Sequence, residues 1–104
     1  MAKIVAVCGS PSSGKTTFLK DFCRCLSDDL GYKLSVIDER SEFKDYYLGF
    51  NTDILSNYPK AKGTLIALRT LSPEVIVFDE LGSVEEAEAV VQGINSGVAF
   101  VMSI

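Results

Sequence analysis

The sequence predicts an α/β domain with a mainly parallel sheet, and three observations support this fold class. Short runs of apolar, β-branched residues alternate with longer segments whose apolar residues recur at helical spacing. The first of these runs is continuously apolar, which is typical of a strand buried on both faces of a parallel sheet. The first run ends at a glycine-rich segment, GSPSSGKT (9–16), and a helical pattern follows at once. Alternating elements of this kind form layered folds with helices on both faces of the sheet.

The first half of the chain supplies two strands and one helix. The run KIVAVC (3–8) predicts the first strand, and residues 15–26 carry apolar side chains at helical spacing. The run KLSVID (33–38) predicts the second strand. Residues 39–59 mix charges, glycine, asparagine and proline with little periodicity, so we expect a long loop there. Loops of this length in compact domains are usually functional or mobile.

The second half repeats the alternation. Residues 60–71 have leucines in helical register, and the run EVIVFD (74–79) predicts a third strand. Residues 83–94 read as a helix with Ser83 as its N-cap and two glutamates in its first turn. The run VAFVMSI (98–104) predicts a fourth strand.

Composition narrows the classes of function. The chain has 104 residues, 47% of them hydrophobic, which suits one domain with a packed core. The net charge is −4 and the lysines are scattered, so no nucleic-acid partner is expected. No apolar run is long enough to span a bilayer and no signal peptide is evident, so the expected compartment is the cytoplasm. The chain has no histidine and no CxxC pair, so its three cysteines read as reduced thiols and not as zinc ligands.

Residues 9–16 match the phosphate-loop pattern GxxxxGK(S/T), in the strand–loop–helix context that this motif requires. Its glycines let backbone N–H groups converge on phosphate oxygens at the positive end of the next helix. We expect Lys15 to neutralise the β- and γ-phosphates and act in catalysis, Thr16 to ligate Mg²⁺, and Thr17 to approach the α-phosphate. The predicted nucleotide-binding residues are Gly9, Ser10, Pro11, Ser12, Ser13, Gly14, Lys15, Thr16 and Thr17.

The run VIVFDE (75–80) supplies the acidic partner of such a loop. The carboxyl ends of parallel strands lie at the ligand-binding edge of the sheet, so Asp79 is predicted to hold Mg²⁺ and Glu80 to orient an attacking water. Glu80 could instead be a solvated residue that begins a loop. The segment DELG (79–82) also fits the DxxG motif of small GTPases, but no NKxD motif follows in these residues. The glutamate directly after Asp79 favours an ATPase.

Two further stretches, VIDERSEF (36–43) and YPKAKGTLIALRTLSPEVIVFDELGS (58–83), resemble the stage III sporulation protein AA family. This family is related to hexameric secretion and traffic ATPases, and the resemblance extends from about residue 4 to the end of the chain. It implies a P-loop NTPase fold of the RecA/ASCE-like kind with strand order 5-1-4-3-2. Because only four strands are predicted here, the expected order is 1-4-3-2 with the fifth strand missing.

The resemblance also implies a function. We expect residues 1–104 to be a single core domain, truncated from a longer protein, that binds and hydrolyses ATP with Mg²⁺. In the family this activity would energise a sporulation channel, so the implied partners are further copies in a hexamer and membrane channel proteins. The implied location is the cytoplasm of the mother cell, at a membrane complex. The N-terminal domain and the sensor segment of the family are not among these residues, so the isolated chain could be inactive.

In the secretion ATPases an acidic segment after the second strand approaches the nucleotide. The resemblance places Asp38, Glu39 and Glu42 in that segment, with Glu39 as our first choice for a catalytic role. From the residues alone, a salt-bridged loop explains these acids nearly as well. Arg40 could pair with the carboxylates or with phosphate, and Arg69 matches a family arginine or supports packing.

Two other classes of function stay open at this stage. In a small-molecule kinase, Asp38 or Glu39 would bind an acceptor hydroxyl, although the arginines of a kinase lid are not apparent. A non-catalytic nucleotide-binding fragment would bind without turnover. The preference for adenine or guanine is also open. Tyr46, Tyr47 and Tyr58 could stack on a base, although ordinary surface or core positions explain them better.

Overall fold

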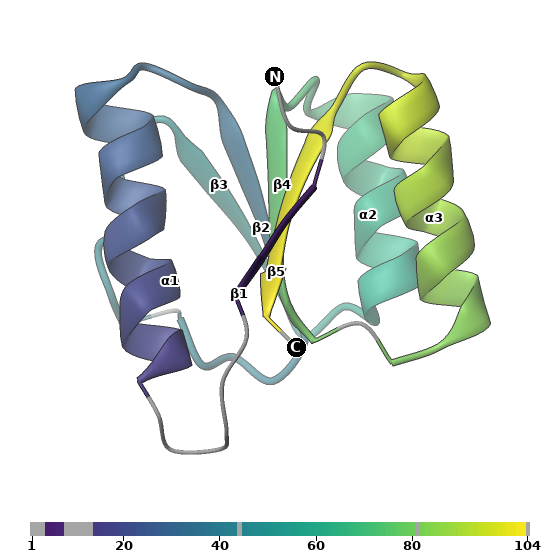
Figure 1. Cartoon of the computed structure of the whole chain (residues 1–104), viewed down its shortest axis with the longest axis horizontal. Helices are drawn as coiled ribbons and strands as arrows, with labels where there is room; N and C mark the ends of the chain where they lie inside the picture. The colour runs from purple at the N-terminus through teal and green to yellow at the C-terminus, as the bar shows by residue number, and fades with distance from the viewer. Residues whose placement is uncertain (1–3, 8–13, 44, 81, 104) are drawn as a thin grey trace.

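The computed structural model describes residues 4–7, 14–43, 45–80 and 82–103. A sheet of five parallel strands lies between α1 on one face and the pair α2 and α3 on the other (Figure 1). The elements are, in chain order, β1 (Ile4–Val7), α1 (Lys15–Arg24), the π-helical turn η1 (Cys25–Asp29), β2 (Leu34–Asp38), β3 (Thr52–Ser56), α2 (Lys60–Thr70), β4 (Val75–Glu80), α3 (Val84–Asn95) and β5 (Ala99–Ser103).

The order of the strands is β1-β5-β4-β2-β3. The four predicted strands are β1, β2, β4 and β5, and they lie side by side in the expected order. The predicted fold class, an α/β fold with a parallel sheet and helices on both faces, is therefore confirmed. The additional strand is β3, which pairs in parallel with β2 from Leu34–Thr52 to Asp38–Ser56.

The prediction that residues 39–59 form only a loop was therefore wrong. β3 lies within that segment, at the edge of the described sheet beyond β2. Its sequence, TDILS, is too polar to read as a buried strand. None of its residues is fully buried, as expected for an edge strand that is covered incompletely. The ion pair of Lys33 Nζ with Asp53 Oδ2, at 2.9 Å, ties β3 to the start of β2.

Both faces of the central strands are covered, which explains their uninterrupted apolar runs. In β4, Val75 and Val77 pack with Leu19 of α1, whereas Ile76 and Phe78 pack on the side of α2 and α3. Successive side chains of a strand point to opposite faces, so a strand buried on both faces needs apolar residues at every position.

The helices follow the predictions closely, with one change at the end of the first. The α-helical geometry of α1 ends at Arg24, and residues 25–29 continue as a π-helical turn. In that turn, the Ser27 hydroxyl accepts a hydrogen bond from Asn51 N (2.8 Å), and Asp28 Oδ1 accepts one from Phe50 N (2.9 Å). These polar side chains anchor the approach to β3.

The other two helices begin and end within a residue or so of the expected positions. The Ser83 hydroxyl caps α3 by accepting a hydrogen bond from Glu86 N at 3.2 Å, as predicted. Among the described helices, none combines the length and the apolar character needed to cross a bilayer.

Candidate functional site

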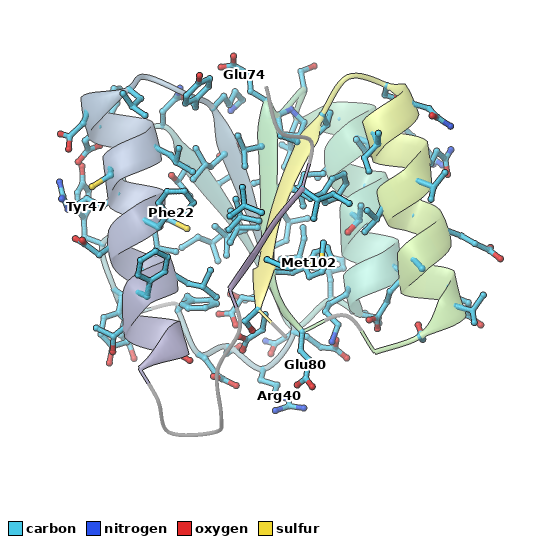
Figure 2. The ribbon with its side chains drawn as sticks, viewed as in Figure 1. Phe22, Arg40, Tyr47, Glu74, Glu80 and Met102 are labelled. Atoms are coloured by element: carbon cyan, nitrogen blue, oxygen red, sulfur yellow. The ribbon has the colours of Figure 1, made fainter. Side chains whose placement is uncertain are left out.

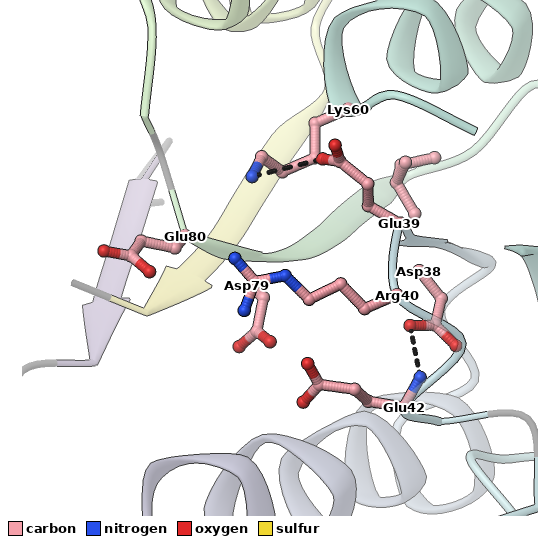
Figure 3. Close-up of a pocket in the computed structure, with 8 residues that line it drawn as sticks. Asp38, Glu39, Arg40, Glu42, Lys60, Asp79 and Glu80 are labelled. Atoms are coloured by element: carbon pink, nitrogen blue, oxygen red, sulfur yellow. Dashed lines mark hydrogen bonds and ion pairs between the residues drawn. The ribbon is translucent and has the colours of Figure 1, made fainter. Parts of the chain in front are cut away.

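The acidic residues singled out in the sequence converge at one end of the sheet. A pocket at the carboxyl ends of β2 and β4 is lined by five carboxylates, two cationic side chains and Ile37 (Figure 3). Figure 2 shows Arg40 and Glu80 at this edge, with Glu74 at the opposite end of the sheet. The charged lining residues are Asp38, Glu39, Arg40, Glu42, Lys60, Asp79 and Glu80.

The start of α1 shows the backbone geometry that a phosphate loop needs. Gly14 directly precedes α1 and has a φ of 89°, a left-handed backbone conformation that residues other than glycine rarely adopt. Its carbonyl accepts a hydrogen bond from Phe18 N. Thr16 is half-buried and Thr17 is exposed in the first turn. Residues 9–13 of the predicted loop lie outside the described residues, as does the side chain of Lys15, so their roles stay predictions.

The acidic pair occupies the last two positions of β4. Asp79 is half-buried and Glu80 is exposed. The hydroxyl of Ser103, at the end of β5, donates a hydrogen bond to the Asp79 carbonyl and lies 3.2 Å from Asp79 Oδ1. The Ser103 hydroxyl thus lies beside both the backbone and the carboxylate of Asp79. Asp79 Oδ2 has no hydrogen-bond partner among the described residues.

Asp38 has a structural task. Its side chain is 3% exposed. Its Oδ1 accepts a hydrogen bond from Glu42 N at 2.8 Å and its Oδ2 accepts one from Phe43 N at 2.9 Å. Both oxygens are thus used in closing the turn that follows β2, so Asp38 is poorly placed to act on a nucleotide.

Glu39 lies directly after β2 and its carboxylate enters the pocket (Figure 3). Its Oε1 lies 3.3 Å from Lys60 Nζ, the nearest cation in the described structure. We did not predict a role for Lys60, which the sequence presents only as one of several scattered lysines. The available signal was its place at the first position of a helix, where a positive charge is unfavourable.

The remaining predicted residues separate into two groups. Arg40 and Glu42 line the pocket, and Arg40 extends across it towards Asp79 (Figure 3). Arg69 lies elsewhere, along the groove between α2 and α3. Tyr46 and Tyr47 are exposed beside α1, where Lys20 Nζ lies 3.1 Å from the centre of the Tyr46 ring. Neither tyrosine lines the acidic pocket.

The pocket suits a cation better than an organic ligand. It encloses about 20 Å³, enough for a water or an ion, whereas pockets for organic ligands span roughly 300–1,000 Å³. Within the described residues, no group of three acidic or cysteine side chains could by itself hold a metal. Mg²⁺ commonly takes only one or two carboxylates and completes its shell with water and phosphate oxygens. A single carboxylate such as that of Asp79 is within that requirement.

Comparison with known proteins identifies the family of this chain and solved structures that share its fold. The family model described as "Sporulation stage III, protein AA" matches residues 2–104. Stage III sporulation protein AA of Bacillus subtilis (strain 168) is 34% identical over 108 residues, which cover 93% of this chain and 35% of that protein. The chain thus spans about a third of the length of the curated relatives it matches.

Two solved structures share the fold over nearly the whole chain. The Legionella pneumophila ATPase DotB superposes with a TM-score of 0.77 at 21% identity, covering 98% of this chain and 30% of DotB. The pilus retraction motor PilT with bound ADP superposes with a TM-score of 0.80 at 18% identity, covering 99% of this chain and 31% of PilT.

Proposed function

This chain belongs to the sporulation stage III protein AA family, and we propose that it is the nucleotide-binding core of an ATP-hydrolysing motor. The observation that carries the proposal is the acidic pair Asp79–Glu80 at the carboxyl end of the central strand β4. This pair lies in a P-loop NTPase fold whose first helix begins with the sequence GKT.

In this proposal each residue has a distinct task. The loop from Gly9 to Thr17 binds the phosphates through backbone N–H groups, and Lys15 neutralises their charge. Thr16 and Asp79 would hold Mg²⁺, which when bound stabilises negative charge on the β- and γ-phosphates. Glu80 orients the attacking water and accepts its proton.

Glu39 assists in placing the metal or the water, from the other side of the pocket. Asp38 is less suited to that task because backbone N–H groups already bond to both of its oxygens. The carboxylates outnumber the cations around the pocket, which would repel a bare nucleotide. Binding should therefore depend on the divalent cation more strongly than the phosphate loop alone would require.

The proposal extends to the role of the whole protein. The names of the relatives, a sporulation protein, an ATPase and a pilus retraction motor, support a motor that works during sporulation. We propose that this motor energises a membrane channel. Such a motor would act as a homo-oligomer, which we propose is a hexamer, on the cytoplasmic side of the membrane of the mother cell.

The test is turnover and binding in the full-length natural protein. Glu80→Gln should lower ATP turnover by at least about 100-fold, because a base that orients water is commonly worth 10²–10⁴ in rate. It should leave the affinity for Mg-ATP within about threefold, since Glu80 acts in the transition state and not in ground-state binding. Lys15→Ala should instead weaken binding by roughly 10- to 100-fold.

The matched controls are exposed residues outside the pocket, Glu85→Gln on α3 and Lys62→Ala on α2. Neither control should change turnover or affinity. Binding without any turnover in the wild-type protein would favour a non-catalytic nucleotide-binding role. Full turnover in Glu80→Gln would remove Glu80 from the mechanism.

A further inference from the structure

Lys60 occupies a position that is electrostatically unfavourable unless it has partners. It is the first residue of α2, after the N-cap Pro59, and the positive end of the helix dipole lies there. Its side chain is nevertheless only 15% exposed. A lysine that is largely withdrawn from water at the positive end of a helix needs compensating negative charge.

Two carboxylates from different elements supply that charge. Glu39 Oε1, after β2, lies 3.3 Å from Lys60 Nζ, and Glu86 Oε1, in the first turn of α3, lies 3.8 Å from it. The side chain of Glu86 is 15% exposed, whereas that of Glu39 is 43% exposed. The ammonium therefore has one sheltered partner and one that reaches the pocket.

Glu86, the more buried of the two partners, also contacts the chain after Glu80. The same oxygen, Glu86 Oε1, accepts a hydrogen bond from Gly82 N at 2.7 Å. The Glu86 backbone N–H in turn donates to the Ser83 hydroxyl. A continuous chain of contacts thus joins Glu39 to Gly82, through Lys60 and Glu86.

We propose that Lys60 is a positioning residue, which holds Glu39 and the turn after Glu80 in fixed relation across the pocket. The inference rests on the proposed function, because it assigns Lys60 a task in hydrolysis at the same site. Hydrolysis would require both sides of the pocket to keep their places while water attacks. Lys60 is the residue whose charge reaches both sides.

The test compares Lys60→Met, which keeps the length of the side chain but removes its charge, with Lys62→Met on the exposed side of α2. In the full-length protein, Lys60→Met should lower kcat by about 10- to 100-fold, the usual effect of a small misplacement of catalytic groups. KM for Mg-ATP should stay within about threefold. Lys62→Met should change neither constant, and Lys60→Arg, which keeps the charge, should recover part of the lost kcat.

A double-mutant cycle distinguishes positioning from simple support of the fold. In a Glu39→Gln background, Lys60→Met should lower kcat clearly less than it does in the wild-type background, because one of the two groups that Lys60 positions is already altered. A loss of kcat that is equally large in both backgrounds would overturn the proposal. If Lys60→Met does not fold, Glu86→Gln tests the same contacts from the other end. Unchanged turnover in folded Glu86→Gln would then overturn the proposal.

The outcomes separate this inference from the function on which it rests. Wild-type protein that binds ATP and never hydrolyses it would overturn both. Wild-type turnover that Lys60→Met leaves unchanged would overturn the role of Lys60 alone, and the roles of Glu80 and Asp79 would be unaffected.

Discussion

The substitution Asp38→Asn tests whether the buried acid at the end of β2 supports the structure or the chemistry. In the native protein its two carboxylate oxygens each accept a backbone hydrogen bond, at 2.8 Å from Glu42 N and 2.9 Å from Phe43 N. Asparagine has nearly the same shape but only one oxygen. Whichever way the amide turns, its NH₂ group faces one backbone N–H.

The expected cost follows from those two contacts. A hydrogen bond to a charged group contributes about 1.5–3 kcal/mol, and a neutral one about 1 kcal/mol. Asp38→Asn removes one charged hydrogen bond entirely and weakens the other, so the turn should lose roughly 2–4 kcal/mol. Because Phe43 is buried in the core beside α1, opening of this turn also exposes its ring.

Hydrogen exchange of the amides of residues 42 and 43 measures that loss directly. Exchange should accelerate by roughly 30-fold to several-hundred-fold in Asp38→Asn, since each 1.4 kcal/mol corresponds to a factor of ten. The control is Glu39→Gln, whose half-exposed side chain bonds to neither amide and should leave both rates within about threefold. Unchanged exchange in Asp38→Asn would refute the structural role.

Two predictions concern the core. Burial raises the pKa of the Cys23 thiol from 9.0 to about 12, so the native thiol stays protonated where the unfolded one ionises. The free energy of unfolding should therefore be unaffected below pH 8 and should fall as pH rises from 9 towards 12, by about 1.4 kcal/mol at pH 10. Urea denaturation of the wild type at several pH values measures this fall, and Cys23→Ala, which lacks the thiol, should not show it. Gly93→Ala would place a Cβ 2.5 Å from Phe100 Cζ, and Phe100 is fully buried. This overpacking should cost about 1–3 kcal/mol of stability, more than the gain of up to about 1 kcal/mol in helix propensity. Gly93→Ala should therefore lower the melting temperature, and a higher melting temperature would contradict this prediction.

The sequence was sufficient for the strands that are buried on both faces. β4 and β5 begin with four contiguous apolar residues, and only Ser35 interrupts the apolar residues of β2 before Asp38. Helices cover both sides of these strands, and such runs are hard to mistake. β3 escaped prediction for the opposite reason. β3 is only partly covered by the rest of the domain, so its sequence keeps polar residues. Its pairing with β2 is determined by the fold as a whole and not by its own sequence.

The candidate site could be predicted to a similar extent. Asp79 and Glu80 were identifiable because they follow a buried strand directly, which fixes their place at the edge of the sheet. Lys60 was not, since its role depends on contacts with Glu39 and Glu86, which are 21 and 26 residues away in the sequence. Contacts that join three separate parts of the chain leave no pattern among neighbouring residues of the sequence.

The acids Asp38 and Glu39 also show why turnover measurements alone would assign roles wrongly. Asp38 anchors the turn that carries Glu39, so losing either carboxylate should lower the rate of hydrolysis. The two substitutions differ in what else they change. Loss of Asp38 should release the amides of residues 42 and 43, whereas loss of Glu39 should leave the turn intact and reduce the effect of Lys60→Met. Kinetics, hydrogen exchange and the double-mutant cycle are therefore needed together to separate an acid that holds the site from one that acts in it.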